Sequence, residues 1–264
     1  MDRNKPVREF LLAALPLTFL ALGAGAQTAR ATATQETVAD YESCMQRVHQ
    51  RTEDALERAL AWEQAGGGTA ARHCAAMALA AIGNLGAAAD QLEALAWDLP
   101  PETSDAARAA VLAQAGQFWF DAGQPAKADA LLSAALDLTP RDPDIRIDRA
   151  MALAATGRLQ DAIIDLSASL VLAPRSIQAL VLRASAYRKS DRPEDALADL
   201  DRALDLDPAH PSALLESGLL HRDLGDETAA RKDWRAVIEA HPDDQAAAIA
   251  RQYLATLPPR RDRR

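Results

Sequence analysis

Two cysteines and two nearby histidines are the first residues of this sequence that could do chemistry. Cys44 and Cys74 are the only cysteines, and His49 and His73 stand close to them. A Cys2His2 metal site is therefore one interpretation. On a helix, however, Cys44 and His49 would point about 140° apart, and His73 and Cys74 would diverge by about 100°. These spacings do not fit zinc ligands, so we expect no metal.

The same two cysteines are candidates for a disulfide. Thiols pair in an oxidising compartment, and a bond between Cys44 and Cys74 would contribute about 3.5 kcal/mol through loop entropy. Cys44 lies beside Tyr41 and Val48 on one apolar helical face, and Cys74 lies on a flank that meets the preceding helices. The sequence favours the disulfide if the chain is exported, and two buried free thiols are the alternative.

No other residues form a catalytic pattern. Most carboxylates fall in turns or at helix starts, where they cap backbone amides or favour the helix dipole. Serines and histidines show no nucleophile elbow. The glycines at 66–68 are not a phosphate loop, because no Gly-Lys-Ser/Thr follows them and no strand precedes them. We therefore expect no catalytic residue, no cofactor and no enzyme activity.

A repeat of 34 residues organises the chain around these candidates. Proline is about 5% of ordinary sequence, so three further prolines at one chosen period have a chance probability on the order of 10⁻⁴. Alanine holds the same interval. The two series are Pro140, Pro174, Pro208 and Pro242, and Ala128, Ala162, Ala196 and Ala230.

Each unit has the pattern of a helix hairpin. Counting places from residues 109, 143, 177 and 211, place 8 is small, which allows two helices to approach closely. Place 15 is a turn residue that can end the first helix, and the proline at place 32 closes the second. The residues at place 8 are Gly116, Ala150, Ala184 and Gly218, and those at place 15 are Gly123, Gly157, Asp191 and Gly225.

These residues resemble the tetratricopeptide repeat (TPR), which has the same length and the same small, alanine and proline places. The resemblance implies an all-α fold, a TPR-like α-solenoid of about five helix hairpins with a C-terminal capping helix. Aromatic residues make up only 4% of the chain, which also favours closely packed helices.

The expected organisation follows from the repeat register. The step from Pro100 to Pro140 is six residues too long, so we expect an inserted surface loop there. The expected segments are a signal peptide 1–26, a linker 27–36, a divergent N-terminal helical pair 37–68, a degenerate repeat 69–102, an insertion 103–108, repeats 109–142, 143–176, 177–210 and 211–244, a capping helix 245–257 and a basic tail 258–264.

The first 26 residues have the features of a secretory signal. A basic start precedes an apolar run from Phe10 to Leu22, and Ala24-Gly25-Ala26 precedes Gln27. This pattern predicts cleavage near Ala26/Gln27 and a periplasmic or secreted protein. An uncleaved anchor is the alternative, but a run interrupted by Pro16 is short of the roughly 20 residues that a membrane helix needs.

The formal net charge of −9 disfavours nucleic acid, which requires a basic stripe. We expect a protein or peptide partner, no nucleic acid, and no stable membrane span after signal cleavage.

The TPR resemblance implies that places 2, 5, 9, 12 and 13 of the first helices line a concave surface. The lysine and asparagine set with which chaperone-binding members grip terminal carboxylates is absent. An apolar floor edged by basic residues suits an apolar peptide or helix with acidic flanks. The alternative is that these side chains pack between neighbouring helices. The candidate groove residues are Ile147, Met151, Val181, Ser185, Arg188, Lys189, Leu215, Leu219 and Arg222.

The sequence thus indicates a non-catalytic periplasmic scaffold for protein interactions. The alternative is a structural accessory subunit of an envelope complex that acts through its outer face.

Overall fold

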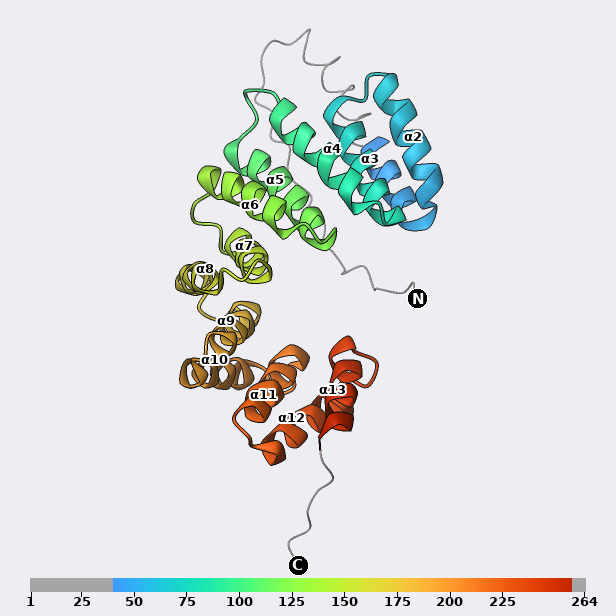
Figure 1. Ribbon diagram of the computed structural model, residues 1–264. Coiled ribbons are helices and arrows are strands. Elements are labelled where there is room, and N and C mark those ends of the chain that lie inside the picture. The colour runs from blue at the N-terminus through green and yellow to red at the C-terminus, as the bar shows by residue number, and fades with distance from the viewer. Residues whose placement is uncertain (1–39, 258–264) are drawn as a thin grey trace, which may run out of the picture. The chain divides into compact units, whose positions relative to one another are not determined.

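The computed structural model describes residues 40–257 and divides the chain into two units, with the boundary after Pro140. The expected signal peptide 1–26, linker 27–36 and basic tail 258–264 lie outside the described residues, as do residues 37–39 of the expected first helix. Residues 40–257 form helices joined by short turns, with no strand (Figure 1). The all-α prediction is therefore confirmed.

The unit that ends at Pro140 contains three pairs of helices, each packed on its neighbours in chain order. A first helix covers residues 40–50 and carries the buried side chains of Cys44, Met45 and Val48. The helices that follow are α2 Thr52–Gln64, α3 Gly68–Ile82, α4 Leu85–Asp98, α5 Asp105–Asp121 and α6 Pro125–Leu138.

The expected insertion at 103–108 is only partly a loop. α5 begins at Asp105, so the surface-loop prediction is wrong over residues 105–108. Ser104 caps this extra turn, because its hydroxyl accepts a hydrogen bond from the backbone N–H of Ala107 at 3.2 Å. Arg108 holds the turn in place by donating to the carbonyls of Ala96, Leu99 and Pro100.

The unit that begins at Arg141 contains three regular hairpins and one further helix. Each first helix starts within one residue of place 1 in the repeat register, and the residue before it accepts a hydrogen bond from a backbone N–H through its side chain. These N-caps are Asp142, Ser176, His210 and Asp244. The helices are α7 Pro143–Ala155, α8 Leu159–Leu172, α9 Ile177–Lys189, α10 Pro193–Leu206, α11 Pro211–Asp223, α12 Glu227–Ala240 and α13 Gln245–Thr256.

Place 15 ends the first helices in a left-handed conformation, as the pattern predicted. The φ angles there are 75° at Gly123, 81° at Gly157, 56° at Asp191 and 81° at Gly225. Glycine adopts this conformation without a steric penalty, and aspartate tolerates it better than most residues. This turn sends the second helix of each hairpin back along the first.

The core of the second unit lies between successive helices. One cluster runs through α7 to α11 and includes Leu166, Leu180 and Leu200, and another joins α11, α12 and α13 around Trp234. α13 covers this last apolar face, since Tyr253 stacks on Trp234 with ring centroids 5.2 Å apart. Each hairpin is therefore buried mainly against its neighbours.

No helix within residues 40–257 is both long enough and apolar enough to cross a bilayer.

Candidate partner-binding surface

The predicted apolar floor is largely inside the protein. Ile147, Val181 and Leu219 are only 2%, 8% and 9% exposed. Their side chains pack between neighbouring helices, which is the alternative that the sequence left open. The prediction that these three residues present an apolar surface is therefore wrong.

The remaining predicted residues keep solvent access. Met151, Ser185 and Leu215 are partly buried. Met151 and Ser185 occupy place 9 of the first helices α7 and α9, and Leu215 occupies place 5 of α11, about one helical turn earlier. Lys189 is exposed, and Arg188 and Arg222 are intermediate. We call Met151, Ser185, Lys189, Leu215 and Arg222 the first-helix face.

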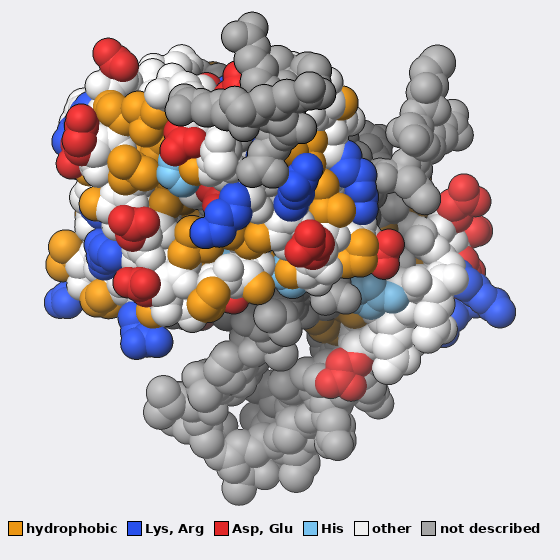
Figure 2. Space-filling view, turned by 90° about the horizontal axis from the view of Figure 1, so that it is seen from below, with side chains coloured by type: hydrophobic (Ala, Val, Ile, Leu, Met, Phe, Trp, Pro, Cys, Tyr) orange, Lys and Arg blue, Asp and Glu red, His pale blue; other side chains and the backbone are white. Residues whose placement is uncertain are grey.

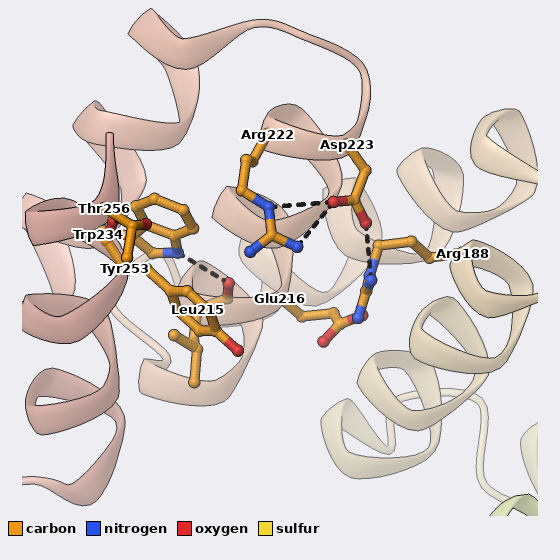
Figure 3. Close-up of polar contacts among 8 residues, drawn as sticks. All are labelled: Arg188, Leu215, Glu216, Arg222, Asp223, Trp234, Tyr253 and Thr256. Carbon is orange, nitrogen blue, oxygen red and sulfur yellow. Dashed lines mark hydrogen bonds and ion pairs between the residues drawn. The ribbon is translucent and has the colours of Figure 1, made fainter. Parts of the chain in front are cut away.

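The two arginines meet through one carboxylate (Figure 3). Arg188 of α9 donates to Glu216 at 2.7 Å and to Asp223 at 2.8 Å, both on α11. Arg222 donates from Nε and Nη2 to Oδ1 of Asp223 at 3.1 and 2.8 Å. Both arginines are thus already paired. An acidic flank of a partner would have to compete with these internal carboxylates.

Burial and pairing act against each other on Asp223. Its partial burial alone would raise the pKa of the carboxyl group, but the hydrogen bonds from Arg222 and Arg188 outweigh burial and lower the pKa. Asp223 therefore stays charged and holds α9 and α11 together.

An aromatic platform adjoins this cluster. The indole N–H of Trp234 donates to the carbonyl of Leu215 at 3.2 Å, and Tyr253 stacks on the indole (Figure 3). The guanidinium carbon of Arg222 lies 5.1 Å from the centre of the Tyr253 ring, within cation–π range. The position of Arg222 is therefore set by both Asp223 and Tyr253.

The sequence analysis did not identify Glu216, Asp223 or Tyr253 as part of this surface. Asp223 could have been found, because it occupies place 13, the place that Lys189 holds one repeat earlier. Tyr253 occupies place 9 when the register is extended to α13, whereas Glu216 is at place 6, outside the places taken from the TPR resemblance; no sequence signal pairs either of them with an arginine.

Two ion pairs with buried carboxylates, which we call the hairpin clamps, each join the first helix of a repeat to the second helix of the same repeat. Arg149 binds Asp165 through two hydrogen bonds of 2.7 Å, and Arg183 binds Asp199 in the same way. Both pairs join place 7 to place 23. In the following repeat Ser217 holds place 7 in place of an arginine. There the Asp233 carboxylate at place 23 pairs with Ser217 at 2.7 Å and with His221 at 2.8 Å. The sequence analysis missed these pairs, although their spacing of sixteen recurs at the repeat period.

The two cysteines form the disulfide that the sequence favoured over free thiols. Cys44 and Cys74 form a disulfide with Cα atoms 6.3 Å apart, and it links the first helix to α3. His73 contacts the Tyr41 hydroxyl and the Gln114 amide. Within residues 40–257 no group of three or more His, Cys, Asp or Glu is placed to hold a metal ion.

The surface is mixed in character. Figure 2 shows one face of the molecule, on which acidic, basic and hydrophobic side chains are interspersed.

Antiparallel helix pairs of equal length, stacked by neighbour contacts, define a helical-repeat protein of the hairpin class. Residues 120–177 and 181–245 match the family model of the tetratricopeptide repeat. The chain is a tetratricopeptide repeat protein, as its residues predicted.

Solved TPR structures share the fold at low sequence identity. TTC0263, a thermophilic TPR protein of Thermus thermophilus, is 19% identical and has a TM-score of 0.57, over 68% of this chain and 95% of that chain. MamA from Desulfovibrio magneticus RS-1 is 19% identical with a TM-score of 0.55, over 64% and 93% of the two chains. YrrB, described as a TPR protein with an unusual peptide-binding site, is 18% identical with a TM-score of 0.51, over 73% and 96%. No curated protein matches the chain in sequence.

Proposed function

We propose that this protein is a non-catalytic scaffold that binds a protein or peptide partner on its first-helix face. The observation that carries the proposal is that Met151 and Ser185 at place 9 and Leu215 at place 5 keep solvent access on three successive first helices of one unit. A helical array repeats the same surface at each step, so an extended partner can contact several repeats. The description of YrrB as a peptide-binding TPR protein supports this use of the fold.

The expected partner is less acidic than the sequence alone suggested. Arg188 and Arg222 are neutralised by Glu216 and Asp223, which leaves Lys189 as the exposed basic residue of this face. A segment with apolar side chains and few charges fits such a surface without displacing internal ion pairs.

The protein acts in the periplasm or outside the cell in this proposal. The signal-like residues 1–26 support export, and an oxidising compartment is where a disulfide such as Cys44–Cys74 is maintained.

A second candidate function is a structural role in an envelope complex through the outer face, that of the second helices. Ile164 and Val171 favour it, because both lie on α8 and are 57% and 79% exposed. Covering such exposed apolar side chains with a partner removes apolar surface from water, which favours binding.

The test compares variants of the two faces in one assay. Tagged M151R/S185R/L215R and I164S/V171S proteins are used to capture partners from an envelope fraction, and each partner is quantified by mass spectrometry. We expect M151R/S185R/L215R to lose a captured partner about tenfold or more, because three long charged side chains block the first-helix face. I164S/V171S should retain it. The reverse pattern would reject the first-helix face and favour the outer one.

Folding must be controlled in both variants by helicity and thermal unfolding. Ile147, Val181 and Leu219 are left unchanged, because a charge at these buried places would unfold the array. Retention of every partner by M151R/S185R/L215R with native helicity would contradict the proposal.

A further inference from the structure

Helix α4 of the first unit carries the most exposed tryptophan of residues 40–257, Trp97, at 56%. Asp90 and Glu93 precede it by seven and four residues, so the three side chains lie on one side of the helix within about 10 Å. Asp90 is exposed and Glu93 is partly exposed, and neither has an ion-pair partner among the described residues. We call Asp90, Glu93 and Trp97 the α4 face.

The later second helices lack this combination of residues. Counted from residue 69, the start of the degenerate repeat, the α4 face occupies places 22, 25 and 29. In the same order, these places hold Ala130, Ser133 and Asp137 in α6, Ile164, Ser167 and Val171 in α8, Ala198, Asp201 and Asp205 in α10, and Lys232, Arg235 and Glu239 in α12. None of them is aromatic. The α4 face is therefore a local feature that the stacking of the repeats does not require.

Cations of this chain lie over other aromatic rings, but not over Trp97. The guanidinium carbon of Arg192 lies 4.4 Å from the centre of the Tyr187 ring, within cation–π range. That of Arg222 lies 5.1 Å from the centre of the Tyr253 ring. Among residues 40–257, no lysine or arginine lies over the Trp97 indole. This ring is therefore left open to a cation from another molecule.

The charge of the first unit favours such a cation. Residues 40–140 contain fourteen Asp and Glu against six Lys and Arg, which is a formal net charge of −8. Arg72 does not neutralise the α4 face, because it is held by Asp98 at 3.0 Å and by Glu63 at 4.0 Å. A positively charged segment is drawn to so acidic a unit, and the attraction weakens as salt screens it.

We propose that the α4 face binds a cationic segment of a partner protein, with an arginine guanidinium on the indole of Trp97 and in contact with the carboxylate of Glu93 or Asp90. A guanidinium suits this face because it is planar, stacks on aromatic rings and donates two hydrogen bonds to a carboxylate. This inference goes beyond the proposed partner site, which lies on the first helices of the second unit and takes a segment with few charges. It gives the scaffold a second contact of different chemistry.

The test titrates the purified protein with a fluorescently labelled octa-arginine peptide and measures binding by anisotropy. W97A should raise the dissociation constant about fivefold, because it removes the stacking contact. D90N/E93Q should also raise it about fivefold, because it removes two carboxylates and changes little in shape. E53Q/E57Q is the matched control: it removes two exposed carboxylates from α2 of the same unit and should change the constant by less than about twofold.

Nuclear magnetic resonance locates the bound peptide. The indole N–H signal of Trp97, assigned by its absence in W97A, should shift during the titration, and that of the buried Trp234 should not. Circular dichroism verifies that each variant folds. Absence of peptide binding, binding that W97A leaves unchanged, or equal weakening by E53Q/E57Q and D90N/E93Q would each overturn the proposal.

A lipid headgroup is the competing cation for this face. Binding to phosphatidylcholine vesicles that is lost in W97A, without binding of octa-arginine, would assign the α4 face to a membrane surface and reject the protein partner. Capture of a partner by the first-helix face is measured separately with M151R/S185R/L215R, so either proposal can fail while the other holds.

Discussion

The unit of residues 40–140 and the unit of residues 141–257 are built from the same hairpin, but different interactions hold their helices together. In the first unit a disulfide joins the first helix to α3, and neutral hydrogen bonds around His73 continue to α5. In the second unit the Arg149–Asp165 and Arg183–Asp199 clamps recur at the repeat period.

This difference follows the regularity of the sequence. A clamp that joins place 7 to place 23 can be copied from repeat to repeat, because the helices keep equal lengths and equal turns. In the first unit the α5–α6 hairpin keeps the repeat register but holds Ala115 and Leu131 at places 7 and 23, so it cannot form the clamp, and the helices before it are divergent. The disulfide of this unit and the hydrogen bonds of His73 each occur once and do not repeat along the chain. We infer that irregular repeats are stabilised by local devices and regular ones by a periodic device.

Removing the disulfide should give the largest difference in stability between the two units. C44A/C74A should destabilise the first unit by about 3.5 kcal/mol, because the unfolded chain regains the entropy of the loop between the two cysteines. Hydrogen exchange followed by mass spectrometry resolves the two units. Peptides from residues 40–50 and α3 should exchange faster, and peptides from α9 and α10 should not change. Equal acceleration in both units would show that the disulfide supports the whole array.

A smaller difference in stability is expected when the same place of the repeat is substituted in each unit. Place 8 is glycine at 116 and 218, and alanine occupies it in the two repeats between them, so the sequence predicts that alanine is tolerated at both glycines. The structure predicts otherwise at Gly218, where an added Cβ would lie 2.3 Å from the indole nitrogen of Trp234. That ring is held by the Leu215 carbonyl and by Tyr253.

G218A should therefore cost about 2 kcal/mol net, an overpacking penalty of about 3 offset by about 1 from helix propensity. G116A should cost less than G218A. There the new Cβ lies 2.8 Å from the side chain of Leu132, which is fully buried and must also shift, but a single leucine side chain adjusts at a lower cost than an indole held on two sides. Chemical denaturation followed by circular dichroism measures both. A larger loss for G116A than for G218A would refute this account of the crowding.

These cases show which parts of the structure a repeat pattern can predict. The hairpin turns and helix starts were predictable, because glycine at place 15 and the capping residues act locally. The exposure of Ile147, Val181 and Leu219 was not, because it depends on how closely neighbouring helices pack. The pairing of Arg188 and Arg222 with Asp223 depends likewise on side chains from two helices. The repeat pattern predicts which residues lie on the first helices but does not determine how much of each side chain solvent reaches.

The smallest expected effect is a difference in acid sensitivity between the units, and it rests on the tautomer of His73. The Gln114 amide nitrogen donates to the sulfur of Met77 at 3.2 Å, so its oxygen faces the ring and accepts from Nε2–H at 2.8 Å. Nδ1 then accepts from the Tyr41 hydroxyl at 3.0 Å. Burial raises the pKa of Tyr41, which keeps this proton in place. The site thus satisfies a neutral imidazole.

Acidification should therefore weaken the first unit and spare the α9–α10 hairpin. Burial lowers the pKa of His73 below its ordinary value of 6.5, although the hydrogen bond to Gln114 acts in the opposite direction. Below pH 6.5 the unfolded chain is protonated at His73 while the folded unit keeps the imidazole neutral. The contribution of His73 to the free energy of unfolding is therefore complete above pH 6.5 and is lost as pH falls towards the folded pKa. Because one proton is involved, the free energy of unfolding changes by at most about 1.4 kcal/mol per pH unit.

Hydrogen exchange of the residue 40–50 and α3 peptides between neutral and mildly acidic pH measures this loss of stability, after correction for intrinsic exchange. H73Q, which keeps a neutral polar group, should abolish the pH dependence, and its persistence in H73Q would assign it to another residue.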